Sequence, residues 1–374
     1  MMLARVPEIR TATYPSDQRG YLGGSDQPAA LRIYGTPHEL PLLAGQLVFV
    51  LGREGDLHAD HDYLSARHLR IERQGNDLRL ENISQNKKNA LVFENREVAT
   101  YCLVRPGDAF KIGNTIYYVL NEEMRMARRK VAEILGVTND KAVDDCLIIA
   151  AKDADRHVVL VGEGGCGQKS LANAIHQCST RRRSNCISVP AASAPGSADP
   201  QCIDDAQDGT LVIELPKDRK FDPVFVERLT APGARVRLVI CLQAPGKLAK
   251  SFPPPITRNA DTIEIASIRA RKDELPVILD NWFVEHRSEL RFRDLDPRIQ
   301  RNLRAHRWRD NLQEVLEAAF QLTVLAQFAS ERAAEGNETF TRSKSRHWRA
   351  KMRIPLPIVP NTAAQTASRK KVKR

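Results

Sequence analysis

The stretch that most constrains the fold is "VLVGEGGCGQKSLANAIHQ", from Val159 to Gln177. A short apolar run leads into a glycine-rich turn and then into a sequence with helical spacing. This order is typical of loops that bind phosphate groups through backbone N–H groups at the start of a helix. The pattern G-x-x-x-x-G-K-[ST] requires lysine where this chain has Gln168, followed by Lys169 and Ser170. The sequence therefore predicts the shape of such a loop and leaves its chemistry open.

Around this loop, strands and helices alternate from about Ala142 to Ala266, which indicates a mostly parallel α/β sheet. The apolar runs lack polar alternation, as expected for strands that are buried on both faces. We assign this α/β domain to residues 142–292 and a small helical lid to 293–336. The five candidate strands read "HVVLVGE", "NCISVPA", "GTLVIEL", "VRLVICL" and "TIEIA".

The region upstream has a different pattern, with short alternating apolar runs separated by turn residues. Runs of this kind at close spacing predict an all-β sandwich, which we assign to residues 30–121. The polar segment 1–29, with Gly, Pro and Ser, is predicted to be disordered. A linker helix is predicted over 122–141, closed by Gly136. The fold class is therefore multidomain.

The net charge of +11 is concentrated in the predicted flexible tail, 337–374. Residues 341–374 hold eleven Lys or Arg and no Asp or Glu, which leaves 46 basic and 46 acidic residues in the rest of the chain. No apolar run reaches the roughly 18 residues of a membrane span, so we expect no membrane partner. The seven cysteines have no metal-ligand spacing and are expected to be reduced thiols in a cytoplasmic protein.

Three predicted loops of the sandwich carry groups suited to a phosphorylated peptide. Arg53 can donate two hydrogen bonds to phosphate oxygens, and Ser65 adds a neutral hydroxyl donor. Asn86 can donate to and accept from an extended backbone. The alternative is that Arg53 and Ser65 only pair with local carboxylates or cap turns.

In chain order, the motifs are "GR" at Gly52-Arg53, S-x-x-H ending at His68, S-x-N ending at Asn86, and "RPGDAFKIGNTIYYV". With them, residues 31–120 resemble a forkhead-associated (FHA) domain, a module that binds phosphothreonine. By this resemblance Gly52 and His68 are structural, and His68 braces the Ser65 loop. The residues expected to bind the phosphopeptide are Arg53, Ser65, Gln85, Asn86 and Lys87. The family usually has Gly-Thr where this chain has Lys87-Lys88, so the loop is expected to be more basic.

The central region resembles the AAA+ domain of bacterial enhancer-binding proteins, which activate sigma-54 RNA polymerase. The matching stretches, in order, are "GEGGCGQKSLANAIHQ", "DGTLVIELP", "VRLVICLQ", "IRARKDELP" and "HRWRDNLQEV". The resemblance implies a vestigial nucleotide site at Gly162, Gly165, Gly167, Gln168, Lys169, Ser170 and Glu214. No metal ligand is predicted, and ATP or ADP binding without hydrolysis stays open.

Several groups that the family uses for hydrolysis are replaced together. Gln168 stands for the phosphate-binding lysine, Leu215 for the water-activating acid, and Gln313 for the lid arginine. Leu242-Gln243 stands for the polar sensor pair. These changes remove most of the charge stabilisation that phosphoryl transfer needs, so we expect no catalytic residues and no enzyme activity. By the same comparison we expect this chain to lack the family's sigma-contacting loop and its C-terminal DNA-reading helices.

We therefore expect a phosphothreonine-binding adaptor in bacterial signalling, whose inactive AAA+ part serves docking or assembly. Its partners would be a Ser/Thr kinase or a kinase substrate, with self-association or mixed assembly with AAA+ homologues. A phosphoserine or unphosphorylated partner stays open. One alternative is a sigma-54-activator-like regulator that binds nucleotide, or binds DNA through its basic tail. A second is an active ATPase whose rearranged loop uses Lys169.

Overall fold

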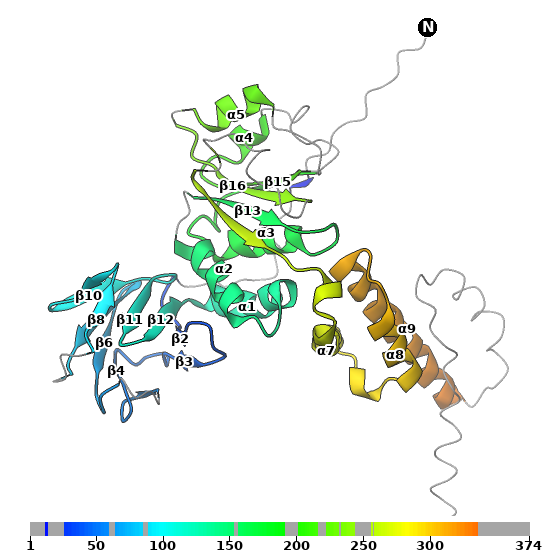
Figure 1. The fold of residues 1–374 in the computed structure, drawn as a ribbon, viewed down its shortest axis with the longest axis horizontal. Helices are drawn as coiled ribbons and strands as arrows, with labels where there is room; N and C mark the ends of the chain where they lie inside the picture. Colours follow the sequence, from blue (N-terminus) through cyan, green and yellow to red (C-terminus); the bar gives the residue numbers. More distant parts are fainter. Residues whose placement is uncertain are drawn as a thin grey trace, which may run out of the picture. The chain divides into compact units, whose positions relative to one another are not determined.

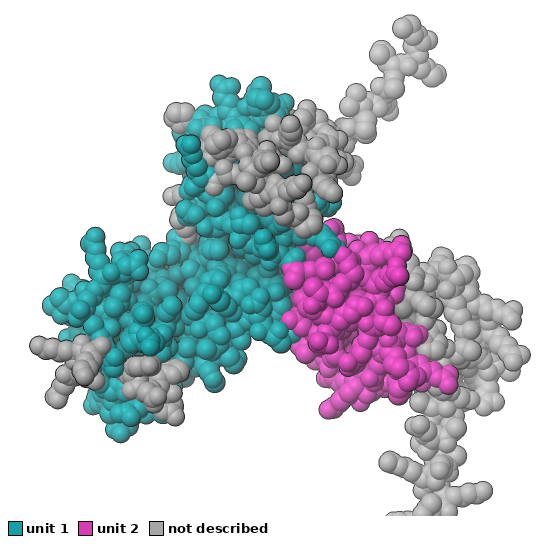
Figure 2. Space-filling view, viewed as in Figure 1, with its two compact units in different colours: residues 1–163, 167–265 teal, residues 164–166, 266–374 magenta. Residues whose placement is uncertain are grey.

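A computed structural model describes most of the chain, in the ranges 12–13, 26–59, 64–84, 89–152, 156–190, 201–215, 222–231, 233–243, 256 and 258–335. The chain divides into two compact units (Figure 2). Unit 1 comprises residues 1–163 and 167–265, and unit 2 comprises residues 164–166 and 266–374.

The first part of unit 1 is an all-β sandwich of two sheets (Figure 1), as the sequence predicts. One sheet has the strand order β10-β7-β6-β4-β5, and the other has the order β3-β2-β12-β11-β8-β9. Pairing is antiparallel except between β4 and β5. The strands are β2 (Ala30–Ile33), β3 (Glu39–Pro41), β4 (Val48–Gly52), β5 (Leu57–His58), β6 (Leu69–Gln74), β7 (Asp77–Asn82), β8 (Leu91–Phe93), β9 (Arg96–Glu97), β10 (Tyr101–Val104), β11 (Ala109–Ile112) and β12 (Thr115–Leu120).

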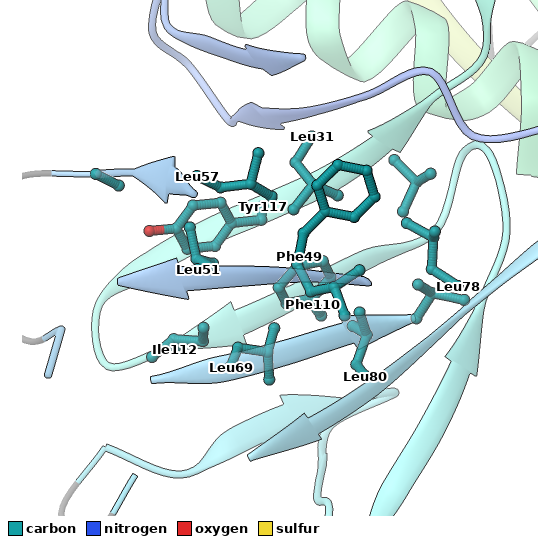
Figure 3. Close-up of a cluster of buried hydrophobic side chains, with 14 of the residues drawn as sticks. Leu31, Phe49, Leu51, Leu57, Leu69, Leu78, Leu80, Phe110, Ile112 and Tyr117 are labelled. Atoms are coloured by element: carbon teal, nitrogen blue, oxygen red, sulfur yellow. The ribbon is translucent and has the colours of Figure 1, made fainter. Parts of the chain in front are cut away.

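Alternation along the strands builds the core between the two sheets. In β7 the side chains of Leu78 and Leu80 are buried, while their neighbours are half-buried. Phe110 and Tyr117 stack with ring centroids 5.5 Å apart in the same core (Figure 3). Because side chains of a strand point alternately to opposite faces, the leucines of β7 face the core and their polar neighbours face outward.

Two helices follow the sandwich, where the sequence predicted one linker helix over 122–141. Helix α1 (Glu122–Leu135) begins at Asn121, whose side chain accepts a hydrogen bond from the N–H of Met124. It ends at Gly136, as predicted, with a φ of 126° that favours glycine. Helix α2 (Asp140–Lys152) then starts within the predicted linker and runs well past it.

A buried polar network fastens the sandwich to α2. Arg32 of β2 is 4% exposed, and its Nε donates to Oδ1 of Asp144, which is fully buried, over 3.2 Å. The same carboxylate accepts from the Tyr118 hydroxyl at 2.9 Å and from the Gly35 N–H at 2.8 Å. Arg32 also donates to Asp140 at 3.1 Å. Burial raises the pKa of Asp144, and these donors oppose that rise by stabilising the charged form.

The second part of unit 1 is the predicted α/β sheet, with all five expected strands present. They are β13 (His157–Val161), β14 (Cys186–Val189), β15 (Thr210–Leu215), β16 (Arg237–Leu242) and β17 (Ala260–Glu264). They pair in parallel in the order β14-β15-β16-β13-β17. The helices are α3 (Gln168–Cys178), α4 (Gln201–Asp205) and α5 (Pro223–Leu229).

One element falls inside the segment that was predicted to be disordered. Strand β1 (Ala12–Thr13) pairs antiparallel with β14, so it occupies an edge of the α/β sheet. An unpaired sheet edge exposes a row of backbone hydrogen-bonding groups, which explains how a short polar stretch can join there. Residues 1–11 and 14–25 lie outside the described part of the chain.

A buried arginine closes the end of α2. Arg237 of β16 is fully buried and donates to the carbonyl oxygens of Ala150 at 2.8 Å and Ile149 at 2.7 Å. Its Nε donates to the Arg156 carbonyl at 3.1 Å. A cation at the C-terminal end of a helix is favourably placed relative to the helix dipole. Hydrogen bonds from this charged side chain thus connect the sheet to α2.

Unit 2 is helical. Its elements are η3 (Ile268–Ala270), η4 (Lys272–Glu274), α7 (Leu275–Glu285), η5 (Phe292–Asp294), α8 (Pro297–Ala305) and α9 (Asn311–Glu335). The lid was predicted to begin at residue 293, but the compact unit begins at Ala266 and includes α7. Helix α7 packs against α9 and buries Ile278 and Phe283, which explains the earlier boundary. Among the described helices, none is long and apolar enough to cross a bilayer. The predicted tail, 337–374, lies outside the described residues.

Candidate functional site

The candidate phosphopeptide site is built where two loops of the sandwich meet closely. The Arg53 N–H donates to the Ser65 carbonyl at 3.1 Å, and the Glu54 N–H donates to the Ala66 carbonyl at 2.9 Å. A Cβ added at Gly52 would lie 2.3 Å from the Ala66 carbonyl oxygen. Only glycine therefore fits at the end of β4, and its absence of a side chain brings Arg53 and Ser65 together.

His68 holds the loop that carries Ser65. Its ring is fully buried, and Nδ1 accepts a hydrogen bond from the Ser65 N–H at 3.1 Å. Nε2 must then carry the proton, which it donates to the Asn89 carbonyl at 2.9 Å. Burial lowers the pKa of His68, and the bond to Asn89 opposes this. The neutral imidazole thus fixes the backbone on which the serine hydroxyl is mounted.

The hydroxyl of Ser65 is held in turn by a second serine. The Oγ atoms of Ser65 and Ser84 are 2.6 Å apart and share a hydrogen bond. The Ser84 N–H donates to the Asn82 side chain at 3.0 Å, which orders the end of β7. Sequence reasoning placed Ser84 in the S-x-N motif and gave it no role. Its place one residue before Gln85 was the signal that it could reach the site.

Arg53 has an exposed side chain, and among the described residues no hydrogen bond or ion pair engages its guanidinium group. Its backbone is fixed, because its carbonyl accepts from Nδ1 of His58 at 2.7 Å. The structure thus brings together Gly52, Arg53, Ser65 and His68. The other predicted binding residues, Gln85, Asn86 and Lys87, lie outside the described residues.

The second predicted site keeps the backbone shape of a phosphate-binding loop. The Gly162 N–H donates to the Leu242 carbonyl at 3.1 Å, which joins the end of β13 to β16. Gly165 and Gly167 have φ values of 73° and 96°, a region that favours glycine. Helix α3 starts directly afterwards, and Ser170 is exposed on its first turn.

Gln168 is directed at the sheet. Its amide nitrogen donates to the carbonyl oxygens of Leu160 and Leu242, each at 2.8 Å, and the residue is only 8% exposed. Both donor hydrogens of the amide are therefore used to join β13 and β16. This side chain has a structural part in the sheet and offers no hydrogen to a phosphate.

Lys169 points toward Glu214, the other charged residue of the predicted nucleotide site. Its Nζ lies 3.0 Å from Oε1 of Glu214, at the end of β15, and both side chains are partly exposed. Glu214 is the position at which the resemblance places a metal-binding carboxylate. Here the lysine already supplies positive charge beside that carboxylate.

The positions of the catalytic acid and the sensor lie in the core. Leu215 is 1% exposed and Leu242 is 4% exposed, and both belong to the apolar cluster of the α/β sheet. Gln313, in place of the lid arginine, donates to Glu317 on the exposed face of α9. Buried apolar side chains thus occupy two of the positions at which the resemblance places polar groups.

Within unit 2, the tip of the loop is bound by the start of α9. The Asn311 amide donates to the Gly164 carbonyl at 2.9 Å, and the Gln313 N–H donates to the Gly165 carbonyl at 3.0 Å. A Cβ at Gly165 would lie 2.1 Å from the Asp310 carbonyl oxygen, so the approach requires glycine. Sequence reasoning missed Asn311, although its place in "RWRDN" could have indicated it.

In the part of the chain that the structure describes, no cluster of His, Cys, Asp and Glu could hold a metal ion.

A family model provides an independent comparison for the α/β region. The sigma-54 interaction domain matches residues 137–198, which include the glycine-rich loop and α3. No curated protein sequence matches the chain.

Solved structures resemble each part separately. NtrX from Brucella abortus in complex with ADP is 16% identical, with a TM-score of 0.40, and the match covers 54% of this chain and 54% of that chain. The chain thus spans about half the length of that structure. The FHA domain of CT664 from Chlamydia trachomatis is 18% identical over 24% of this chain and 94% of that chain, with a TM-score of 0.22. The FhaA FHA domain, complexed with the intracellular domain of Rv3910, is 22% identical over 24% and 97%, with a TM-score of 0.21.

The chain combines an FHA-like sandwich with an AAA+-like α/β domain, in which residues 137–198 match the sigma-54 interaction domain. The motifs and the two-sheet arrangement characterise the first part. The parallel sheet with its glycine-rich loop characterises the second.

Proposed function

We propose that this protein is a phosphothreonine-dependent adaptor whose AAA+-like domain does not hydrolyse ATP. The observation that carries the proposal is the contrast between two cations. Arg53 is exposed, and its backbone N–H is bonded to the carbonyl of Ser65, whereas Lys169 is already paired with Glu214. Arg53 is therefore available to bind a phosphate group of a partner, whereas the charge of Lys169 is neutralised by a carboxylate of the same domain.

The chemistry of the sandwich site suits a phosphate monoester on a peptide. A guanidinium group donates paired hydrogen bonds to two phosphate oxygens, and a hydroxyl donates one more. The Ser65 hydroxyl is oriented by Ser84, and its backbone is held by His68. Because the serine hydroxyl is held before the ligand arrives, little of its side-chain entropy is lost on binding, whereas Arg53 becomes ordered only in the complex.

Calorimetric titration of the full chain tests the binding proposal. Phosphothreonine peptides should bind, and the matching unphosphorylated peptides should not. Arg53→Ala should weaken binding by about 10-fold to 100-fold, because one or two charge-assisted hydrogen bonds are lost. Arg96→Ala, another exposed arginine of the sandwich, is the matched control and should leave the affinity unchanged. Equal binding of phosphorylated and plain peptides would overturn the proposal.

A turnover assay with ATP and magnesium tests the second half of the proposal. We expect no hydrolysis above background for the full chain or for Lys169→Ala. Magnesium-dependent turnover that disappears in Lys169→Ala would instead support a rearranged site that uses this lysine. Titration with ADP in parallel measures whether nucleotide binds without being hydrolysed.

A further inference from the structure

Helix α8 and its flanks carry an exposed arginine face. Between residues 293 and 309 the chain has six arginines and no lysine, and all six side chains are exposed. The members of this arginine face are Arg293, Arg298, Arg301, Arg304, Arg307 and Arg309. Residues three apart on a helix are neighbours on its surface, so the charges on α8 form one stripe.

The opposite side of α8 fixes the orientation of this face. Ile299 and Leu303 are buried, and the Trp308 side chain behind them is fully buried, with its Nε1 donating to the Leu303 carbonyl at 3.1 Å. The guanidinium group of Arg304 lies over the ring of the buried Phe292, at 5.2 Å from its centroid. The arginines therefore belong to a packed helix whose outer side is held toward solvent.

The acidic groups nearby leave most of this charge unmatched. Asp294 pairs with Arg293, and the Asp296 carboxylate caps α8 by accepting from the Arg298 N–H at 2.7 Å. Glu314 accepts from Nε2 of His306 at 2.6 Å. Within the described ranges, no ion pair or hydrogen bond engages the guanidinium groups of Arg298, Arg301, Arg307 and Arg309.

A hollow of about 550 Å³ continues the face at the end of α8. Its walls include Arg307, Arg309 and His306, together with Asp310 and Glu314. The Glu314 carboxylate is already occupied by His306 and by the Asp310 N–H, which donates at 3.2 Å. The two arginines are therefore the side chains of this hollow that can meet an added anion.

We propose that the arginine face binds the phosphate backbone of duplex DNA. Double-stranded DNA carries about one negative charge per 1.7 Å of its axis, which is a linear anion that a stripe of guanidinium groups can follow. Arginine suits phosphate because its planar fork donates two parallel hydrogen bonds.

Duplex DNA fits this face better than a single strand does. Binding to single strands uses exposed aromatic side chains on which bases stack. Phe292 and Trp308 are buried, and among the described residues of α8 and its flanks no other aromatic side chain except His306 occurs. Such a face contacts backbone and reads no bases, so binding should depend little on DNA sequence.

Fluorescence anisotropy with a labelled duplex of about 30 base pairs tests the proposal in the full chain, between roughly 50 and 200 mM salt. The triple variant Arg298→Gln, Arg301→Gln, Arg307→Gln should weaken binding at least 10-fold at the lower salt concentration. The slope of log K against log salt should fall by about 2 to 3, since each phosphate contact contributes about 0.9. The matched control, Arg70→Gln, Arg96→Gln, Lys111→Gln, removes the same charge from exposed positions of the sandwich and should change binding less than about 3-fold.

Each other outcome would overturn the proposal. Unchanged binding in the α8 variant would assign DNA retention to the tail alone. Equal losses in the two triple variants would assign it to net charge. If polyglutamate binds with the same affinity as DNA and the α8 variant loses this binding, an acidic protein would be the ligand of the arginine face. Circular dichroism and a thermal melt should be the same for both variants, which keeps a folding defect from imitating a binding defect.

Discussion

The glycine-containing loop of the sandwich and that of the α/β domain differ in the surroundings of their nearest cation. In the sandwich, Gly52 allows two loops to approach each other, and the exposed Arg53 is bonded through its backbone to the loop that carries Ser65. In the α/β domain, the backbone of the phosphate loop is preserved around Gly167, but Lys169 is matched by Glu214. In both loops the glycines allow a close approach of the backbone, and the loops differ in whether the nearby cation has a carboxylate partner.

The largest expected difference between the two regions is their response to acid. Burial, followed by the charge of Arg237, lowers the pKa values of His157 and His176 in the α/β domain to about 4. The folded state keeps these rings neutral. Their contribution to the free energy of unfolding is therefore complete above 6.5, the pKa of histidine in the unfolded chain. It is lost as the pH falls from 6.5 toward about 4, by up to about 3 kcal/mol for each histidine.

Hydrogen exchange at about pH 7.5 and pH 5, corrected for intrinsic rates, measures this difference. Amides of β13 and β16 should lose more protection than amides of β6 and β7, where His68 is shifted in the same direction but less. Burial raises the pKa of Asp144, which acts in the opposite direction. His176→Gln removes one titrating group and should flatten the pH dependence of the α/β amides. An unchanged profile in this variant would contradict the prediction.

Glycine substitutions sharpen the comparison of the loops. Gly52→Ala places a Cβ at 2.3 Å from the Ala66 carbonyl oxygen and should cost about 2 to 3 kcal/mol of unfolding free energy. It should also abolish phosphopeptide binding by moving Ser65. Gly164→Ala is the matched control, because nothing lies within 4 Å of its Cβ. Urea unfolding should show a change under about 0.5 kcal/mol for this control. A similar loss in both variants would refute the close-approach argument.

Gln168→Lys attempts to restore the missing lysine. The substitution removes two buried hydrogen bonds to strand carbonyls. We therefore expect the free energy of unfolding to fall by about 1 to 3 kcal/mol. Gln168→Met removes the same bonds without adding charge, and it should be destabilised by a smaller amount. ATP hydrolysis should stay absent, because Leu215 cannot activate water. Magnesium-dependent turnover in the lysine variant would show that Gln168 alone had silenced the site.

Lys169→Met should have the smallest effect. The pair with Glu214 is partly exposed, and such pairs contribute about 0 to 1 kcal/mol after screening by solvent. Urea unfolding of the variant should therefore differ from that of the parent protein by less than 1 kcal/mol. A larger loss would mean that the ion pair stabilises the domain more than its exposure suggests.

The sequence predicted the fold well, because local patterns determine it. The alternation of Leu78 and Leu80 and the apolar runs of the parallel strands are set by a few neighbouring residues each. The end of α1 followed from Gly136. The boundaries were less accurate, because the start of α2 and the membership of α7 depend on which distant helix or strand they pack against.

The sequence indicated which residues belong to the candidate sites, but it did not indicate which atoms their side chains contact. Motif order pointed to Arg53, Ser65 and His68, which the structure brings together. It could not predict that Gln168 would bond to the Leu242 carbonyl or that Lys169 would meet Glu214, because these partners lie 74 and 45 residues away. Side-chain direction and long-range pairing are decided by tertiary packing, and a single sequence carries no local signal for them.

The network of Arg32, Asp144 and Tyr118 has a consequence for how a partner is engaged. Two modules joined by a flexible linker would present their ligands over a broad range of separations, and their effective concentration would follow the linker length. Here the sandwich is held to α2 by buried hydrogen bonds, so that range is narrow. The buried bonds therefore restrict the separation of the sandwich and α2 in a way that a flexible linker would not.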